Sequence, residues 1–249
     1  MNTGFLAAAQ FLTRIPIHLR EAPDLTASVK WFPVVGALVG AAVGLTAAGL
    51  MHVVPASVAA AVAIVVGVLI TGAFHEDGLA DTADALGGFT PERRREILKD
   101  SRHGSYGVAA MCSTIVLRTV CVATLGPAAA VAGLVAAHTL GRGSIIAVMA
   151  VARPSAQEGL GADQARLLSR STAASGLVAT VGITAVATGW WVGPLVVAAA
   201  VGAALVARLA VRTFEGVSGD HLGATEQVVE CLVLVVVSGL ALRGSPWWA

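Results

Sequence analysis

The sequence predicts an all-α, polytopic integral membrane protein with about seven transmembrane helices and a polar site on the cytoplasmic face. The composition is 56% hydrophobic and 12% charged, whereas soluble globular domains carry about 25% charged residues. The mean hydropathy is +0.81, and long apolar runs alternate with polar loops. These observations exclude a water-soluble domain, a secreted disulfide scaffold and a disordered chain. The net charge of +1 also argues against nucleic-acid binding, which needs an excess of basic residues.

Seven apolar runs are long enough to cross a bilayer as helices, since a crossing needs about 17 to 25 apolar residues. The predicted spans are residues 32–54, 56–74, 106–124, 128–151, 173–192, 194–211 and 225–242. Four spans begin at or beside a proline, namely Pro33, Pro55, Pro127 and Pro194, and proline is tolerated in a first helical turn. Residues 5–12 are apolar but too short to span. We expect them to lie at the membrane interface as an amphipathic helix.

The basic residues predict the orientation of these spans, because loops on the cytoplasmic side collect Lys and Arg. Of the sixteen, thirteen lie before the first span or after the second, fourth and sixth spans. Arg243 alone lies on the opposite side, while Arg118 and Arg142 fall within spans. The prediction is a protein of the cytoplasmic (inner) membrane with its N-terminus inside and its C-terminus outside.

The acidic residues gather on the same side, although carboxylates contribute little to orientation. All fifteen lie before the first span, after the second or fourth, or around the start of the seventh. We therefore expect one transmembrane domain, 1–249, whose cytoplasmic active-site loops lie at about 75–105, 152–172 and 212–225.

The richest polar segment is HEDGLADTAD at residues 75–84. In a helix, Asp77, Asp81 and Asp84 fall at i, i+4 and i+7, which places three carboxylates on one face. Like charges at this spacing repel one another, and a hard cation such as Mg²⁺ would relieve the repulsion. The alternative is an ordinary solvated acidic loop, although no Lys or Arg occurs between His75 and Gly88.

A second segment follows in the same loop and reverses the sign of the charge. Asp100 and Arg102 precede Gly104 and Gly107, and glycines let a ligand approach the backbone closely. We interpret Arg102 as a phosphate contact. The run of arginines at 93–95 is better explained by membrane topology or by lipid headgroups.

A third segment joins the sixth and seventh spans and carries Asp220, Glu226 and Glu230. Glu230 is expected about one turn inside the span, where an ionisable group is a functional candidate. Three further polar residues lie within spans, namely Arg118, His138 and Arg142. A buried ion pair or a snorkelling side chain explains these three as well as a functional role does.

Five motifs, in this order, resemble the cobalamin synthase family, the adenosylcobinamide-GDP ribazoletransferases. They are FLTRIP at 11–16, FPVVG at 32–36, HEDGLADTAD at 75–84, DSR at 100–102 with Gly104 and Gly107, and SGD at 218–220 with LGA at 222–224. The resemblance spans nearly the whole chain, and the segment 75–84 is its most specific part. The chain departs from the family at Ala85, where many relatives have glycine, and at 155–157, where SAQ replaces a Tyr-Ala-Arg-like segment. No substrate contact is therefore assigned to residues 155–157.

The resemblance implies a transferase in which the 5′-hydroxyl of α-ribazole, or its 5′-phosphate analogue, displaces GMP from adenosylcobinamide-GDP. The product is adenosylcobalamin or its phosphate. The expected partners are these small-molecule substrates and membrane lipids, with no nucleic acid, and homo-oligomer formation is left open.

The resemblance and the residue pattern together assign roles to nine side chains. Asp77, Asp81 and Asp84 are expected to bind the Mg²⁺ cofactor, and Asp100 or Asp220 to activate the attacking hydroxyl. The expected substrate contacts are His75, Arg102, Glu226 and Glu230. An acidic metal site beside a basic segment suits attack on a diphosphate, because the metal offsets charge on the phosphoryl oxygens and on the leaving group.

Two other functions compete with this interpretation. One is a different Mg²⁺-dependent membrane phosphotransferase, of the CDP-alcohol type, whose paired-aspartate order differs from the order found here. The other is a transporter, in which charges within the membrane mark an ion path. A transporter is expected to place polar residues near mid-span and to use both faces, whereas these carboxylates gather on one.

Overall fold

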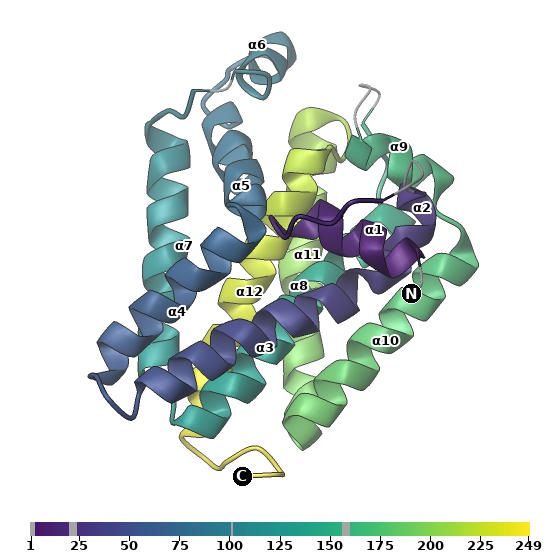
Figure 1. Ribbon diagram of the computed structural model, residues 1–249. Helices are drawn as coiled ribbons and strands as arrows, with labels where there is room; N and C mark the ends of the chain where they lie inside the picture. The colour runs from purple at the N-terminus through teal and green to yellow at the C-terminus, as the bar shows by residue number, and fades with distance from the viewer. Residues whose placement is uncertain (1–2, 20–23, 101, 156–159) are drawn as a thin grey trace.

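The computed structural model describes residues 3–19, 24–100, 102–155 and 160–249, and these residues form helices joined by loops, with no β-strand (Figure 1). The α-helices are α1 (Thr3–Leu12), α2 (Leu25–Ser28), α3 (Phe32–Leu50), α4 (Ala56–Thr71), α5 (Phe74–Ala85), α6 (Pro91–Ile97), α7 (Ser105–Ala123), α8 (Pro127–Val151), α9 (Leu160–Leu167), α10 (Arg170–Thr188), α11 (Val192–Phe214) and α12 (Gly219–Ala241). Two 3₁₀-helices, η1 (Val29–Trp31) and η2 (Gly189–Trp191), precede α3 and α11. The predicted all-α class is confirmed.

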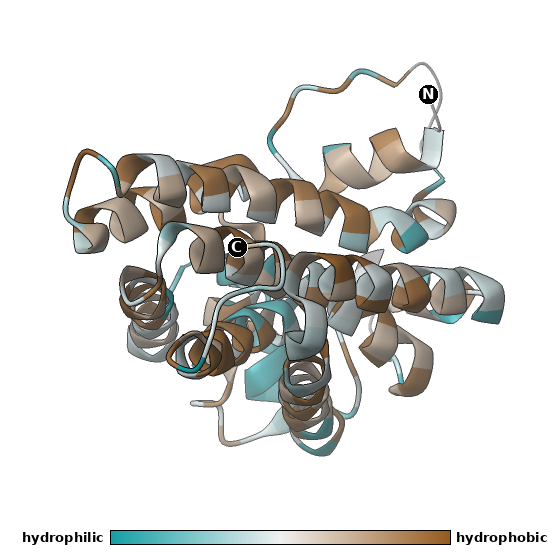
Figure 2. Cartoon of the chain, turned by 90° about the horizontal axis from the view of Figure 1, so that it is seen from below, coloured by the Kyte–Doolittle hydropathy of each residue, from teal (hydrophilic) through white to brown (hydrophobic). Residues whose placement is uncertain are grey.

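The helices are apolar on their outer surfaces as well as in the core. Leu45 in α3, Leu69 in α4, Val178 in α10 and Leu205 in α11 are all exposed. Hydrophobic residues accordingly run along most of the helices when the molecule is seen from below (Figure 2). A helix that is apolar all round suits a lipid surrounding, in which the helix also satisfies its own backbone hydrogen bonds.

A helix lies at each of the seven predicted span positions, but the number of spans is not confirmed as seven. Five segments of the described chain are long and apolar enough to cross a membrane by themselves, and a bent pair of helices raises the number to six. Two features explain the difference. Helix α4 has only 16 residues, fewer than the about 20 that a crossing needs, and Arg170–Phe214 forms one apolar stretch of 45 residues.

Helix α8 lies at the centre of the molecule and is its most buried long helix, with 78% of its apolar window buried. Helix α3 packs very closely against it through a stripe of glycines at every fourth position, namely Gly36, Gly40 and Gly44. A Cβ atom added to Gly40 would lie 2.5 Å from the Leu134 carbonyl oxygen of α8. Small residues at this spacing let two helix backbones approach each other within a membrane.

A bend of 90° separates α4 from α5. Gly72 and Ala73 form it, with φ of 68° and 58°, a left-handed conformation that glycine adopts without steric cost. The N-terminal segment braces the bend, because the backbone N–H of Arg14 donates to the Ile70 carbonyl at 2.7 Å. The bend directs the acidic helix α5 against α7 and α12.

The polar segments after α4, α8 and α11 meet at one end of the bundle, away from the C-terminus (Figure 1). Arg95 of α6 pairs with Glu215 after α11, with a distance of 2.5 Å between Nη2 and Oε2. Ser155 donates its backbone N–H to the Val217 carbonyl at 2.9 Å. These contacts bring together parts of the three loops that the sequence singled out.

Candidate active site

Helices α5 and α12 touch backbone to backbone at the site. A Cβ atom added to Gly78 of α5 would lie 2.9 Å from the backbone oxygen of Asp220 and 3.3 Å from the Cα atom of Gly223. Larger residues at either glycine would hold the helices apart. This close approach brings Asp220, at the start of α12, near the acidic face of α5.

Two of the three predicted metal ligands lie together and are joined by a histidine. One ligand atom each from Asp77, Asp81 and His103 lies within 4.8 Å of the others. His103 Nε2 is 3.4 Å from Asp77 Oδ1, and His103 Nδ1 is 3.5 Å from Asp81 Oδ1. We call these three residues the acidic group. No role was predicted for His103, although its position in the polar segment 100–107 was a usable signal.

The negative charge of the two carboxylates in the acidic group is not balanced by their contacts with His103. Partial burial, together with the carboxylates of Asp77 and Asp220, raises the pKa of Asp81 to about 6. Asp81 lies in α5, beyond the bend and outside the five helices that are long enough to span on their own. A raised pKa caused by burial and by like charges means that a cation would stabilise the ionised form. The residues therefore fit a small, hard cation, which prefers oxygen ligands.

Asp84, the third predicted ligand, lies outside the acidic group and has other partners. Its carboxylate accepts hydrogen bonds from the backbone N–H groups of Gly104, at 2.6 Å, and Gly107, at 2.8 Å. These two groups lie at the N-terminal end of α7, where unpaired N–H groups and the helix dipole favour a negative charge. Asp84 thus fixes α7 and the segment carrying His103 against α5.

Asp100 and Arg102 form a pair with each other on the surface. Arg102 Nη2 lies 2.7 Å from Asp100 Oδ2, and the Arg102 side chain is 87% exposed. Hydrogen bonds from the side chain and backbone of Arg102 lower the pKa of Asp100 to about 2. A carboxylate held in its charged form in this way is a weak proton acceptor.

Glu226 and Glu230 lie in a buried network of charges rather than at a surface. Arg118 donates to Glu76 at 2.9 Å and to Glu230 at 2.8 Å. Arg142 contacts both Glu226 and Glu230, and all five side chains are at most 5% exposed. We call these five residues the buried ionic cluster.

Two histidines border the buried ionic cluster. His138 Nδ1 lies 2.9 Å from Arg142 Nη1, and His75 Nδ1 lies 3.8 Å from Glu226 Oε2. His138, Glu226 and Glu230 also have the spacing of metal ligands, but Arg142 already contacts both carboxylates. The contacts therefore favour an ion-pair network, one of the three explanations that the sequence left open for Arg118, His138 and Arg142.

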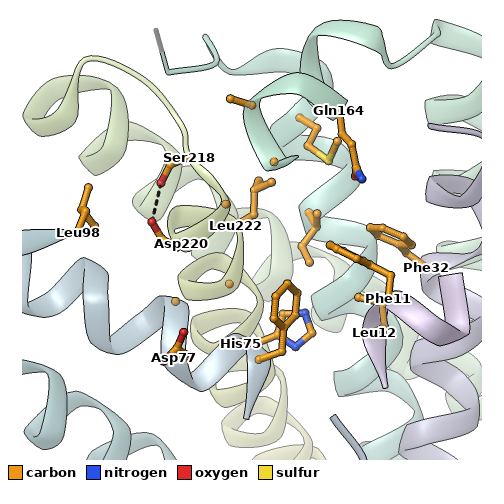
Figure 3. A pocket seen from close by; sticks show the side chains of 18 of the residues that line it. Phe11, Leu12, Phe32, His75, Asp77, Leu98, Gln164, Ser218, Asp220 and Leu222 are labelled. Atoms are coloured by element: carbon orange, nitrogen blue, oxygen red, sulfur yellow. Dashed lines mark hydrogen bonds between the residues drawn. The ribbon is translucent and has the colours of Figure 1, made fainter. Parts of the chain in front are cut away.

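A cavity of about 360 Å³ lies between α5, α9, α12 and the N-terminal helices (Figure 3). Asp77, Ser218 and Asp220 contribute to one side of it, and Ser218 Oγ lies 3.3 Å from Asp220 Oδ2. Two of the predicted catalytic and metal-binding carboxylates therefore face the same space. His75 also lines the cavity, whereas Arg102, Glu226 and Glu230 do not.

Comparison with known proteins assigns the chain to a family. The family model described as cobalamin-5-phosphate synthase matches residues 4–238. An adenosylcobinamide-GDP ribazoletransferase of Shewanella amazonensis is 36% identical over 94% of each chain. The protein of the same name from Bradyrhizobium diazoefficiens is 38% identical over 94% of this chain and 93% of its own. No solved structure matches. A match over nearly the full length, both of this chain and of its relatives, means that this chain belongs to the cobalamin-5-phosphate synthase family.

Proposed function

We propose that this protein joins α-ribazole, or α-ribazole 5′-phosphate, to adenosylcobinamide-GDP and releases GMP. The observation that carries the proposal is that Asp77 lines the same cavity as Asp220 and also belongs to the acidic group with Asp81 and His103. The relatives of this chain carry the activity in their names. In the reaction, a ribose oxygen forms a bond to the phosphorus next to cobinamide. The bond from that phosphorus to the GMP oxygen breaks, and GMP leaves with the bonding electrons.

The family description corrects one detail of the sequence-based expectation. A product described as a cobalamin 5-phosphate keeps the phosphate of its nucleoside, so the 5′-oxygen of that substrate is already occupied. The attacking group on the phosphorylated substrate is therefore another ribose hydroxyl, and the expectation of a 5′-hydroxyl is wrong for it.

We assign Mg²⁺ to the acidic group, with Asp77 and Asp81 as its carboxylate ligands. When bound there, Mg²⁺ would offset the negative charge that develops on the phosphoryl oxygens and on departing GMP. Asp84 supports the site by holding the segment that carries His103. We assign proton removal from the attacking hydroxyl to Asp220 rather than Asp100, because Asp220 lines the cavity and Asp100 is engaged by Arg102.

Arg102 is assigned to the diphosphate of adenosylcobinamide-GDP. Its guanidinium is exposed. A guanidinium has five N–H donors, so it can donate to phosphate oxygens while Nε and Nη2 also donate to Asp100. The buried ionic cluster favours this enzyme over a transporter, because its arginines and carboxylates are paired with one another. An ion path would instead need groups free to exchange partners.

One assay tests the proposed function. The purified full chain, in lipid nanodiscs with Mg²⁺, adenosylcobinamide-GDP and α-ribazole, should release GMP only when both substrates are present. Excess EDTA should stop the release, and Mn²⁺ should restore it. Full turnover in EDTA would contradict the metal assignment, and the absence of GMP release in complete mixtures would contradict the function.

We further propose that the site faces the cytoplasm, as the distribution of Lys and Arg predicts. Reporter fusions after residues 100 and 165 should report the cytoplasm, and a fusion after residue 249 should report the opposite side. A cytoplasmic C-terminus would show that the chain crosses the membrane an even number of times, given an inside N-terminus. The segment Arg170–Phe214 would then be the first to re-examine.

A further inference from the structure

The cavity has two chemically different sides. Figure 3 shows Asp77, Ser218 and Asp220 on one side, and Phe11 and Phe32 on the other. Phe74 joins the apolar side, where Phe11 stacks on Phe32 with ring centroids 5.9 Å apart and meets the edge of Phe74 at 5.2 Å. Ile145 and Met149 of α8 complete this side. A ligand that fits both sides has a flat apolar end and a polar end.

The apolar side also contains two polar atoms for which the described part of the chain offers no hydrogen-bond partner. Gln164 is 6% exposed and His75 1% exposed, and both line the cavity. Gln164 Nε2 and His75 Nε2 are buried without a hydrogen-bond partner among the described residues. An unpaired buried polar group is unfavourable, so a ligand that supplies the missing hydrogen bond gains affinity. Gln164 Nε2 is a donor, and its partner must therefore be an acceptor, such as a ring nitrogen.

The size of the cavity indicates which of the two substrates it can hold. A volume of about 360 Å³ lies at the small end of ligand pockets, which range from about 300 to 1,000 Å³. It suits a nucleoside and is too small for a corrin macrocycle that also carries a nucleotide.

We propose that this cavity is the binding site for the nucleoside substrate, α-ribazole. This inference rests on the proposed function and adds to it the location of one substrate. The heteroaromatic base lies among Phe11, Phe32 and Phe74, and Gln164 donates a hydrogen bond to it. The ribose lies towards Asp77 and Asp220, where its attacking hydroxyl meets the acidic group. Adenosylcobinamide-GDP then approaches from outside the cavity, on the side of the acidic group.

Two substitutions test the proposed binding site, one by filling the cavity and one by removing a hydrogen-bond donor. Ala162 is 2% exposed and lines the cavity, so Ala162→Trp should fill the space that the base needs. Gln164→Leu keeps nearly the same volume and removes the donor. Val178→Trp, on the exposed face of α10, is the matched control for adding an indole ring.

The measurements are equilibrium dialysis of α-ribazole alone with the full chain in nanodiscs, and KM values for both substrates. Ala162→Trp should weaken α-ribazole binding by more than tenfold, and Gln164→Leu by roughly threefold to tenfold, the effect of one hydrogen bond. The KM for adenosylcobinamide-GDP should change less than about twofold. Asp81→Asn should still bind α-ribazole while releasing almost no GMP. Val178→Trp should behave as the wild type.

The outcomes that would contradict the proposed binding site differ from those that would contradict the proposed reaction. Unchanged α-ribazole binding in both cavity variants would overturn the proposed binding site while leaving the function intact. A rise confined to the KM for adenosylcobinamide-GDP would overturn it as well, because the cavity would then hold the other substrate. If the wild type bound α-ribazole in the cavity but never released GMP, the transfer reaction would fail and the binding site would stand.

Discussion

The buried ionic cluster and the acidic group each include a residue of α5, and these two residues, Glu76 and Asp77, are adjacent in the sequence but have opposite surroundings. Glu76 of α5 is buried and pairs with Arg118, whereas the next residue, Asp77, is 62% exposed and has no arginine or lysine partner within the described chain. Consecutive residues of a helix point about 100° apart, so one faces the bundle and the other faces the cavity. The buried ionic cluster and the acidic group therefore share a helix but not an environment.

The difference between them is one of charge compensation. In the buried ionic cluster, two arginines lie among three glutamates, so each carboxylate has a cationic partner close by. In the acidic group, a histidine is the nearest basic side chain, and carboxylate repulsion contributes to the raised pKa of Asp81. Compensated charges stabilise an arrangement of helices, while uncompensated ones are available to a ligand. Four substitutions test this distinction.

Asp81→Asn should reduce GMP release by several orders of magnitude without lowering the Tm. The amide keeps the volume of the carboxylate, and the loss of negative charge relieves repulsion from Asp77. The loss of metal stabilisation in the transition state costs on the order of several kcal/mol, at tenfold in rate per about 1.4 kcal/mol. Activity and Tm should be measured together, with Glu92→Gln in exposed α6 as the control. Near-normal turnover would refute the metal site, and a loss explained by unfolding would make Asp81 a structural residue.

Arg142→Met should show the reverse pattern, with a large fall in Tm. Removing one partner from a buried network leaves Glu226 and Glu230 undercompensated, which typically costs about 3 to 5 kcal/mol. Adding Glu226→Gln to the same chain should recover part of the loss, because it removes one uncompensated charge. Arg93→Met is the control, since Arg93 pairs with Glu96 on the surface. An unchanged Tm in Arg142→Met would show that the network does not hold the helices together.

Gly78→Ala should affect both regions moderately, because it separates α5 from α12. The added methyl meets the backbone at Asp220, and overpacking of this kind costs about 1 to 3 kcal/mol. Turnover should fall, since Asp220, which is assigned to proton removal, moves away from the acidic group. Gly239→Ala in α12 is the matched control, because an added Cβ there has no neighbour within 4 Å. Equal behaviour of the two variants would mean that the close helix contact is not needed for the site.

Arg102→Ala should have the smallest effect on the fold and a selective effect on one substrate. The side chain is exposed, so the Tm should not change. The KM for adenosylcobinamide-GDP should rise on the order of tenfold, the loss of one charged hydrogen-bonding group, while α-ribazole binding stays constant. The pKa of Asp100 should return towards its usual range, because Arg102 supplies the hydrogen bonds that lower it. A KM equal to that of Arg93→Met would remove Arg102 from the phosphate site.

The sequence alone was enough to predict the helical class, the membrane setting, the position of each long helix and the clustering of polar loops. It also placed Asp77 and Asp81 on one helical face. These features follow from local pattern: apolar length, proline at helix starts and the i, i+4 spacing. The function could also be predicted from local sequence, because each family motif holds its polar residues at fixed spacing within one segment.

The structure was needed to show which side chains from different helices meet. It placed His103 with Asp77 and Asp81, gave Asp84 to the N-terminal end of α7, and put Glu226 and Glu230 into a network with Arg118 and Arg142. It also revealed the aromatic side of the cavity, formed by Phe11, Phe32 and Phe74 from three separate helices. Helical spacing fixes neighbours only within one helix, whereas contacts between helices depend on the bend at Gly72 and on the close approach at Gly78.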